Sequence, residues 1–387
     1  MNDEIGGVCI VTQPERSQTG KNHVRDLADI IEQLTTVAIL TANLPVDSSL
    51  GSEYDVTEFS SKGTGKSLPV EVYRFATNQL RLCREIAKRD EAVILFFGAV
   101  SYVLPVLCSR LLGKKTIVQP RGDVPLSLQL RWEDSFPSAV PTVIPRTLAG
   151  FVELLERTSY RSADIVITYT PAMARELGLE RYGEKLHPNG ARFVDANCFD
   201  VSVPFGNREQ CVGFIGRLDV EKRVPELAET ARLLPDYIRF VFVGDGEYRK
   251  HLEQELADEI ESGQVEIIGW VDREAIPEQL NRLRLLVVPS HPTEGLPTII
   301  LESMACGTPV YVTPVSGVPD VVREGETGFI IDSHEPARMR SDIIDILARE
   351  EFEDVSGRCR RLIRDEFSLE AAVERYRSIL TDDVPAD

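Results

Sequence analysis

Short runs of aliphatic residues alternate with longer amphipathic segments along most of the chain, and this alternation occurs in two series. The apolar runs of the first series are residues 7–12, 37–42, 93–97, 115–119 and 164–169. Those of the second series are residues 211–216, 239–244, 265–270, 284–290, 309–313 and 328–332. Apolar positions recur at helical spacing between the runs, as in residues 23–34, 148–163, 224–234 and 336–350. Buried strands of parallel sheets read as continuous apolar runs, so their alternation with helices predicts two doubly wound α/β domains with parallel sheets.

The two series meet at residues 187–210, which are rich in Pro, Gly, Asn and Asp and have little periodicity, as a linker has. We therefore place a first Rossmann-like domain at residues 1–200 and a second at 201–367, followed at 368–387 by an amphipathic helix and a polar tail. Ligands bind beyond the carboxyl ends of the strands in such sheets, so two facing domains predict a site in the cleft between them.

Residues 92–109 form an uncharged stretch that is nearly long enough to span a bilayer, which takes roughly 17–25 residues. The run VILFF, followed by Gly98, instead reads as a buried strand, and SYVLPVLCSRLLG reads as a helix that ends at Gly113. We favour a strand plus a helix over a membrane span.

The charge balance excludes one class of partner. The chain has 62 Asp and Glu against 43 Lys and Arg, and its net charge of −19 argues against nucleic acid, which needs a basic face. Acid-rich, lysine-poor surfaces suit a cell with molar internal salt, so we predict a halophilic source, the alternative being an ordinary acidic cytosolic protein. The 7 cysteines have no Cys-x-x-Cys spacing and the N-terminus has no signal-peptide core, so we expect a cytoplasmic protein.

Cationic side chains follow the first strand of the second series, in GFIGRLDVEKR. Gly216 ends the strand, and Arg217 and Lys222 lie just beyond it. A glycine at a strand end lets the backbone approach a ligand, while Arg binds a phosphate as a fork and Lys as a point charge. The motif predicts a diphosphate site; the alternative, a solvated charge run that opens the next helix, fits the motif alone equally well.

Two glycine motifs lack the spacing of a phosphate-binding loop. Gly244 and Gly246 follow a strand without a complete Gly-x-Gly-x-x-Gly, so a tight turn is favoured there, and GTGK at residues 63–66 reads as a loop. No Asp-x-Asp occurs, and the 5 histidines show no zinc-ligand spacing. We therefore expect neither a metal nor a cofactor.

Two glutamates, Glu294 and Glu302, flank the start of a predicted helix in EGLPTIILE. Pro297 suits the first helical position, and Glu302 then lies about 7–8 Å along the helix axis. The amides of Gly295 and Leu296 lie at the helix N-terminus, where an anion is stabilised. Carboxylates so placed can accept hydroxyl hydrogen bonds from an elongated ligand, which predicts a site for a nucleotide-diphosphate sugar. The alternative is a helix-start acid with an unrelated surface glutamate.

Several longer motifs occur in the order found in one family. They are SADIVITYTPAMARELG, HPNGARFVDANCFD, GRLDVEK, EGLPTIILE and ESMACGTPVYVTPVSGVPDVVREGETGFIID. On these motifs the chain resembles the family-4 (group 1) retaining glycosyltransferases of the GT-B fold, over nearly its whole length and most densely at residues 211–332. The resemblance implies two facing Rossmann-like domains, with the final helix crossing back onto the first.

The resemblance also implies roles for residues of the second domain. Arg217 and Lys222 would bind the donor diphosphate, Glu294 would face the donor sugar, and all three would take part in catalysis. Glu302 would bind the ribose. The other donor-binding residues would be Gly216, Gly244, Gly269, Trp270, Gly295, Leu296 and Pro297. The family retains anomeric configuration, uses no metal and lets the leaving diphosphate help to deprotonate the acceptor.

The first domain departs from the family pattern in two places. Many members have a His before a Gly after the fifth strand, where this chain has Arg121 before Gly122. Arginine stays protonated and cannot be a general base, but Arg121 can bind a phosphate as a catalytic residue, and Asp123 can meet an acceptor hydroxyl. An Arg–Asp pair at a turn is the alternative. Gly20 alone stands for the usual glycine pair at the turn before the first helix, so Gly20, Arg121 and Asp123 are the predicted acceptor-binding residues.

The sequence thus predicts a metal-independent, retaining transferase that moves a sugar from a nucleotide-diphosphate sugar to a glycan, lipid-linked oligosaccharide or surface-polysaccharide precursor. The alternatives are a sugar-nucleotide 2-epimerase on the same fold and a non-catalytic nucleotide-sugar-binding partner, which Arg121 would suit. A glycoside hydrolase would leave the cationic residues unexplained. Arg110, Lys114 and Lys115, beside the apolar residues 101–113, predict peripheral contact with the inner face of a membrane.

Overall fold

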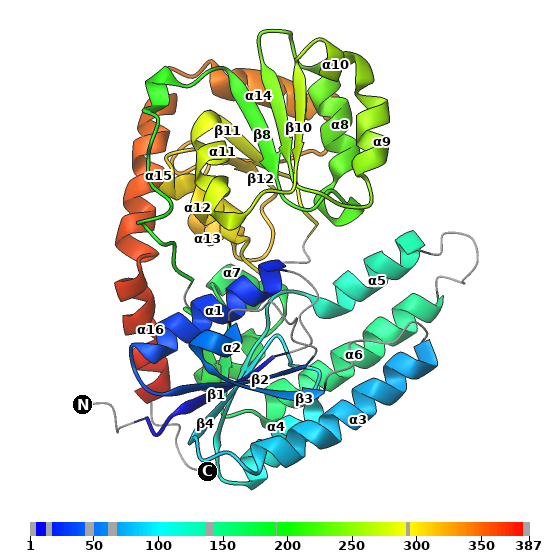
Figure 1. Ribbon diagram of the computed structural model, residues 1–387, viewed down its shortest axis with the longest axis vertical. Coiled ribbons are helices and arrows are strands. Elements are labelled where there is room, and N and C mark those ends of the chain that lie inside the picture. Colours follow the sequence, from blue (N-terminus) through cyan, green and yellow to red (C-terminus); the bar gives the residue numbers. More distant parts are fainter. Residues whose placement is uncertain are drawn as a thin grey trace. The chain divides into compact units, whose positions relative to one another are not determined.

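The computed structural model describes residues 5–12, 18–42, 50–60, 68–135, 143–190, 192–291 and 295–381. The chain forms two compact units, which are described separately (Figure 1). Unit 1 comprises Met1–Arg192 together with Ala372–Asp387, and unit 2 comprises Phe193–Ala371. The chain therefore passes between the units twice, after Arg192 and after Ala371.

Unit 1 contains a parallel sheet with the strand order β3-β2-β1-β4-β5-β6-β7. Its strands are β1 (Val8–Thr12), β2 (Val37–Ala42), β3 (Asp55–Ser60), β4 (Val93–Phe97), β5 (Lys115–Gln119), β6 (Ile165–Ile167) and β7 (Leu186–His187). Its helices are α1 (Gln18–Glu32), α2 (Leu50–Glu53), α3 (Leu68–Ile86), α4 (Val103–Leu111), α5 (Val124–Ser135), α6 (Val143–Ser162) and α7 (Pro171–Glu176), with the 3-10 helix η1 (Glu180–Lys185). β1 pairs with β2 on one side and β4 on the other, so the strand order reverses between β1 and β4.

Unit 2 contains a second parallel sheet, with the strand order β10-β9-β8-β11-β12-β13. Its strands are β8 (Cys211–Ile215), β9 (Arg239–Val243), β10 (Val265–Gly269), β11 (Leu285–Val288), β12 (Val310–Val312) and β13 (Phe329–Ile330). Its helices are α8 (Val224–Leu233), α9 (Arg249–Glu255), α10 (Ala257–Glu261), α11 (Ile276–Arg282), α12 (Thr298–Ala305), α13 (Val318–Val321), α14 (Pro336–Leu347) and α15 (Phe352–Glu366), with the 3-10 helices η2 (Phe205–Asn207), η3 (Val220–Lys222) and η4 (Arg273–Ala275). The order reverses between β8 and β11, and in doubly wound sheets such a reversal is where ligands bind.

The predicted strands of both series are present, and the sequence missed β3 and β7 at the two edges of the sheet in unit 1. β3 reads DVTEFS, of which only the last two residues are buried, and β7 has 2 residues. Edge strands bury less of their surface, so they lack the continuous apolar run that predicts a central strand. Residues 92–109 contain β4 and α4, which confirms the predicted strand plus helix. In the described part of the chain, no helix has the length and apolar character needed to cross a membrane.

The last helix, α16 (Leu369–Thr381), joins unit 1 just after it begins. The buried Tyr376 hydroxyl donates a hydrogen bond to Gln119 Oε1 at 2.7 Å, and Lys115 Nζ donates to the Leu380 carbonyl at 2.9 Å. Tyr376 thus meets the last residue of β5 and Leu380 meets the first, so α16 runs opposite to β5.

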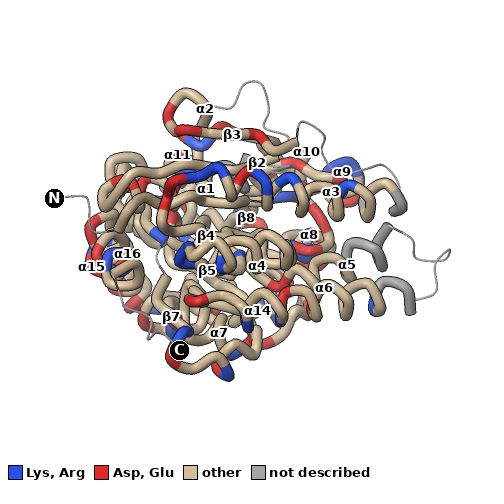
Figure 2. The backbone as a smooth tube through the Cα atoms, turned by 90° about the horizontal axis from the view of Figure 1, so that it is seen from below, with Lys and Arg blue, Asp and Glu red and all other residues tan. Residues whose placement is uncertain are grey.

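Basic and acidic residues are interspersed along the helices of both units (Figure 2). Many are paired, as Arg282 is with Glu266 at 2.6 Å and Arg338 with Asp342 at 3.1 Å.

Candidate functional site

Two loops of unit 2 meet at the carboxyl edge of its sheet, where the strand order reverses. One follows β8 and the other follows β11. Asp219 Oδ1 accepts a hydrogen bond from the Lys222 amide at 3.0 Å and so caps η3, which directs the Lys222 side chain inward. Lys222 is only 7% exposed, and its Nζ lies 3.3 Å from Ser290 Oγ in the loop after β11. The structure thus places a buried ammonium at the reversal point, beside a hydroxyl that the sequence did not single out.

Arg217, which also follows β8, lies in a different electrostatic environment. Its Nη1 is 2.5 Å from Asp219 Oδ2, and its Nη2 is 3.2 Å from Glu221 Oε2. Burial raises the pKa of Asp219, and the Arg217 charge acts in the opposite direction. The Arg217 side chain is 46% exposed, so solvent screens these pairs. Part of the Arg217 charge is therefore already compensated by Asp219 and Glu221.

Arg223, the third cation of the motif after β8, contacts a histidine and a glutamate that the sequence did not pair with it. Its backbone is left-handed, with φ 51° and ψ 41°. Its Nη2 lies 3.4 Å from His291 Nδ1, and its Nη1 lies 3.2 Å from Glu226 Oε1. Burial, with the Arg223 charge, lowers the pKa of His291, which favours the neutral ring at pH 7.

The glycines after β8 and β9 bring two backbone segments into close contact. Gly244 has φ +139°, and a Cβ placed there would lie 1.9 Å from the Gly216 carbonyl oxygen. A Cβ on Gly246 would lie 2.3 Å from the Leu218 carbonyl oxygen. These contacts agree with a tight turn after β9, which holds the Gly216 loop in place. Trp270, which follows β10, is 56% exposed.

The predicted helix after β11 is present as α12, but its start differs from the prediction. Thr298 is its first residue and Pro297 is the N-cap, with ψ 125°, so placing Pro297 at the first helical position was wrong by one residue. The extended ψ angle keeps Pro297 outside the helix. Gly295 and Leu296 are buried, and the Gly295 carbonyl accepts from the Gly317 amide at 2.6 Å. Glu294 lies outside the described residues.

Glu302 is the fifth residue of α12 and is 7% exposed. Its Oε1 lies 3.5 Å from Nη2 of Arg273, in η4. The sequence did not single out Arg273, which the fold of unit 2 brings close to Glu302. The Arg273 guanidinium thus fixes the direction of the Glu302 carboxylate.

In unit 1, Arg121 lies beside a histidine from a distant segment. Arg121 Nη2 is 3.2 Å from His23 Nδ1 on α1, and its guanidinium carbon is 5.3 Å from the Phe97 ring centroid. Asp123 Oδ1 accepts from the Leu126 amide at 2.8 Å and so caps the start of α5. Gly20 lies within α1, which begins at Gln18, so its expected place in the turn before the first helix was wrong.

Glu156 on α6 is a buried acid that the sequence interpretation missed. It is 8% exposed, and burial, with contributions from Asp123 and Glu153, raises its pKa to about 8. Burial also raises the pKa of Asp123. The sequence did contain a signal for the burial of Glu156. The residue stands at helical spacing from Val152 and Tyr160 and therefore lies on the apolar face of residues 148–163. Perturbed carboxyl groups of this kind cluster at functional sites.

Glu156→Gln is expected to change how stability depends on pH. The folded protein keeps a proton on Glu156 that the unfolded chain releases above the ordinary pKa of 4.5, so the contribution of Glu156 to stability falls as pH rises to about 8. Glutamine has no such proton. The free energy of unfolding of the variant should therefore rise relative to that of the wild type by a few kcal/mol across this window, at about 1.4 kcal/mol per pKa unit. Urea unfolding at a series of pH values measures the difference. Glu374→Gln, at an exposed position paired with Arg377, is the control, and parallel wild-type and Glu156→Gln curves would contradict the prediction.

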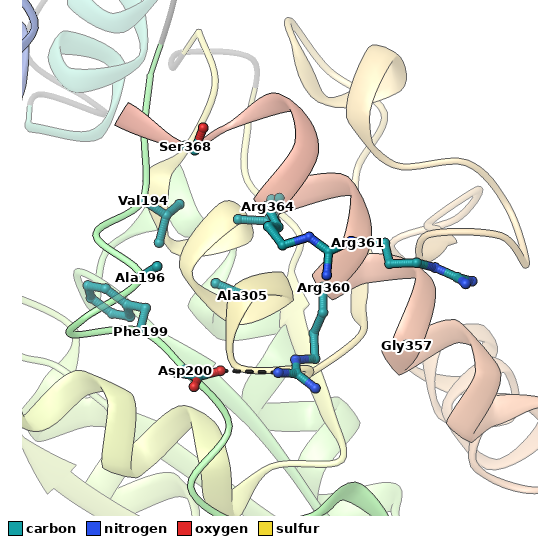
Figure 3. Close-up of a pocket in the computed structure, with 11 residues that line it drawn as sticks. Val194, Ala196, Phe199, Asp200, Ala305, Gly357, Arg360, Arg361, Arg364 and Ser368 are labelled. Atoms are coloured by element: carbon teal, nitrogen blue, oxygen red, sulfur yellow. Dashed lines mark hydrogen bonds and ion pairs between the residues drawn. The ribbon is translucent and has the colours of Figure 1, made fainter. Parts of the chain in front are cut away.

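A separate pocket of about 300 Å³ lies in unit 2 between the segment 194–200, the end of α12 and α15 (Figure 3). Arg360, Arg361 and Arg364 line it, and Arg360 is 3.2 Å from Asp200. Ala305, the last residue of α12, also lines it, so the pocket lies at the opposite end of that helix from Gly295 and Leu296. It is therefore not part of the candidate donor site. No cluster of three His, Cys, Asp or Glu residues that could hold a metal occurs among the residues described.

The chain is similar to known proteins over much of its length. Residues 200–363 match the sequence profile of the family Glycosyl transferases group 1. The chain is 28% identical over 284 residues to the D-inositol 3-phosphate glycosyltransferase of Segniliparus rotundus, covering 69% of this chain and 59% of that protein. It is 25% identical over 266 residues to the sulfoquinovosyl transferase of Arabidopsis thaliana, covering 63% and 50%. The chain resembles the group 1 glycosyltransferases and spans about half the length of the curated relatives it matches.

A solved structure shows the fold. HepE of Anabaena in complex with UDP superposes with a TM-score of 0.73 at 15% identity, over 97% of this chain and 99% of that one. The two parallel-sheet units therefore have the GT-B fold predicted from the sequence.

Proposed function

We propose that this chain, whose unit 2 matches the group 1 glycosyl transferases, is a glycosyltransferase that uses a nucleotide-diphosphate sugar as donor. The acceptor is a hydroxyl-bearing glycan or a lipid-linked glycan precursor. Transfer proceeds with retention and needs neither a metal nor a cofactor. The donor binds at the carboxyl edge of the sheet in unit 2, and the acceptor contacts unit 1.

One observation carries the proposal, the buried Lys222 beside Ser290 where the strand order reverses. A diphosphate leaving group gains negative charge as the sugar departs, and a fixed ammonium stabilises that charge best where water is scarce. Lys222 then supplies a charge that a metal would otherwise bring. The UDP bound to the related HepE fold agrees with a nucleoside diphosphate as ligand.

Glu302 and the start of α12 complete the donor site in this proposal. Glu302, held by Arg273, accepts hydrogen bonds from the ribose hydroxyls. Glu294 faces the sugar, and Trp270 covers the nucleobase. In unit 1, Arg121 binds an anionic part of the acceptor, and His23 fixes the direction of its guanidinium.

Release of nucleoside diphosphate tests the proposal. The protein is incubated with UDP-, GDP-, ADP- and dTDP-sugars, each with and without a membrane extract as acceptor, in buffer containing EDTA. Acceptor-dependent release is expected with one nucleotide class, and NMR of the product should show the anomeric configuration of the donor. Binding without turnover would favour a non-catalytic partner, and conversion of the free donor at C2 would favour an epimerase.

A further inference from the structure

A small pocket lies in unit 1, at the carboxyl ends of β4, β5 and β6. Its polar lining residues are His23, Asp26, Gln119, Tyr169, Arg192 and Tyr376. The cavity leaves about 10 Å³ for the centre of a water-sized sphere, which is room for a single water molecule or monatomic ion. Its chemistry is therefore set by the few groups that line it.

Three donors that line this cavity have no hydrogen-bond partner among the described residues. They are Gln119 Nε2, Tyr169 OH and Arg192 Nε. Their side chains are at least nine-tenths buried, because the three residues are 0%, 5% and 7% exposed. Burial raises the pKa of Tyr376, so its phenol stays protonated and donates to Gln119 Oε1, which leaves the Gln119 amide hydrogens for the cavity. A buried donor without an acceptor costs about 1–3 kcal/mol, so three in one place indicate a common acceptor.

Arg192 adds a charge to this set. Its guanidinium carbon lies 4.2 Å from the Tyr169 ring centroid, and no carboxylate of the described residues lies within ion-pairing distance of it. Buried charges in proteins are normally paired, because an uncompensated one costs several kcal/mol. A water molecule has too few lone pairs for three donors and leaves this charge uncompensated, whereas an anion can accept from all three donors and compensates the charge.

The α1 side of the cavity carries two further groups. Arg121 Nη2 can only donate, so His23 Nδ1 accepts, and the neutral ring carries its hydrogen on Nε2. Asp26 is half-buried and opposes an anion. The one carboxylate thus faces the Arg192 guanidinium and the neutral donors of Gln119 and Tyr169, and this set of groups favours a ligand that accepts hydrogen bonds.

We propose that this cavity is a halide site that takes one chloride ion, held by the donors of Gln119, Tyr169 and Arg192. The bound ion stabilises the two places where the chain leaves unit 1 and returns to it. Arg192 is the last residue of unit 1 before the chain leaves, and Tyr376 lies just after the chain returns. This inference does not depend on the transferase activity.

Thermal unfolding at constant ionic strength tests the site in solution, with sodium chloride replaced stepwise by sodium gluconate, whose anion is too large for the cavity. The wild type is expected to show a saturable rise in Tm with chloride, as a ligand of the folded state produces. Arg192→Met and Tyr169→Phe should lose that rise. Arg181→Met is the matched control, because Arg181 also lies over a tyrosine ring, at 5.3 Å from Tyr182, but is exposed. The control should keep the wild-type rise.

Crystals of the wild type soaked in bromide locate the ion directly, and an anomalous peak is expected within hydrogen-bonding distance of Arg192 Nε. A cavity that holds only water, with no peak in bromide, would overturn the proposal. A peak without chloride-dependent stability would mark an adventitious ion only and would overturn it too. An equal chloride effect in a folded Tyr169→Phe variant and the wild type would have the same consequence.

Discussion

Replacing Lys222 with alanine is expected to lower kcat/KM for sugar transfer by roughly 10²–10³-fold, the usual cost of removing one fixed group that stabilises transition-state charge. The ammonium is 7% exposed and lies 3.3 Å from Ser290 Oγ, so little water can replace it near the diphosphate. Arg217 cannot take over the role, because Asp219 and Glu221 already compensate part of its charge. Most of the loss should appear in kcat, since the charge to be stabilised grows as the sugar leaves.

Steady-state kinetics and calorimetric titration of the donor measure this effect. Lys222→Arg keeps the charge and should recover part of the activity, while Lys250→Ala, at an exposed position on α9, should behave as the wild type. Because Lys222 is buried, the Tm of each variant is needed to separate unfolding from loss of charge. A folded Lys222→Ala variant with wild-type kcat/KM and donor affinity would remove Lys222 from the mechanism.

The sequence predicted what depends on local pattern. A buried strand needs a continuous apolar run, and the residue after it falls at an edge of the sheet, so Gly216, Arg217 and Lys222 could be placed beyond β8 without coordinates. The GT-B fold was predicted for the same reason, because the alternation of strands and helices occurs in two series. The edge strands β3 and β7 were missed because they bury too little apolar surface to give this signal.

The pairing of residues far apart in the chain could not be predicted. His23 contacts Arg121 because the sheet brings α1 and the end of β5 together, and nothing in either segment indicates the other. Arg273 at Glu302 and Tyr376 at Gln119 are similar cases. One sequence supplies the chemistry of each group, whereas its partner depends on the strand order and on how the helices pack.

Gly20 shows the limit of a motif without its structural setting. A lone glycine before an amphipathic segment suits a turn, but the helix begins earlier and includes it. Glu156 shows the opposite case, since its position on an apolar helical face was visible and was read only as part of that helix.

Gly244→Ala is expected to lower the free energy of unfolding by about 3 kcal/mol or more, because two separate effects add. The residue has φ +139°, which side chains rarely adopt, and its new Cβ would lie 1.9 Å from the Gly216 carbonyl oxygen, where backbone rather than a flexible side chain must move. Gly263→Ala separates the two effects, because Gly263 has φ +79° but nothing within 4 Å of the added Cβ, so it should cost only about 1–2 kcal/mol. Urea unfolding of both variants measures the difference.

Equal losses of unfolding free energy in the two variants would mean that the Gly216 loop moves away from the added Cβ at little cost. The same loop precedes Arg217 and Lys222, so a large excess for Gly244→Ala, with weaker donor binding in the remaining folded protein, would show that this glycine contact holds the cationic residues in position.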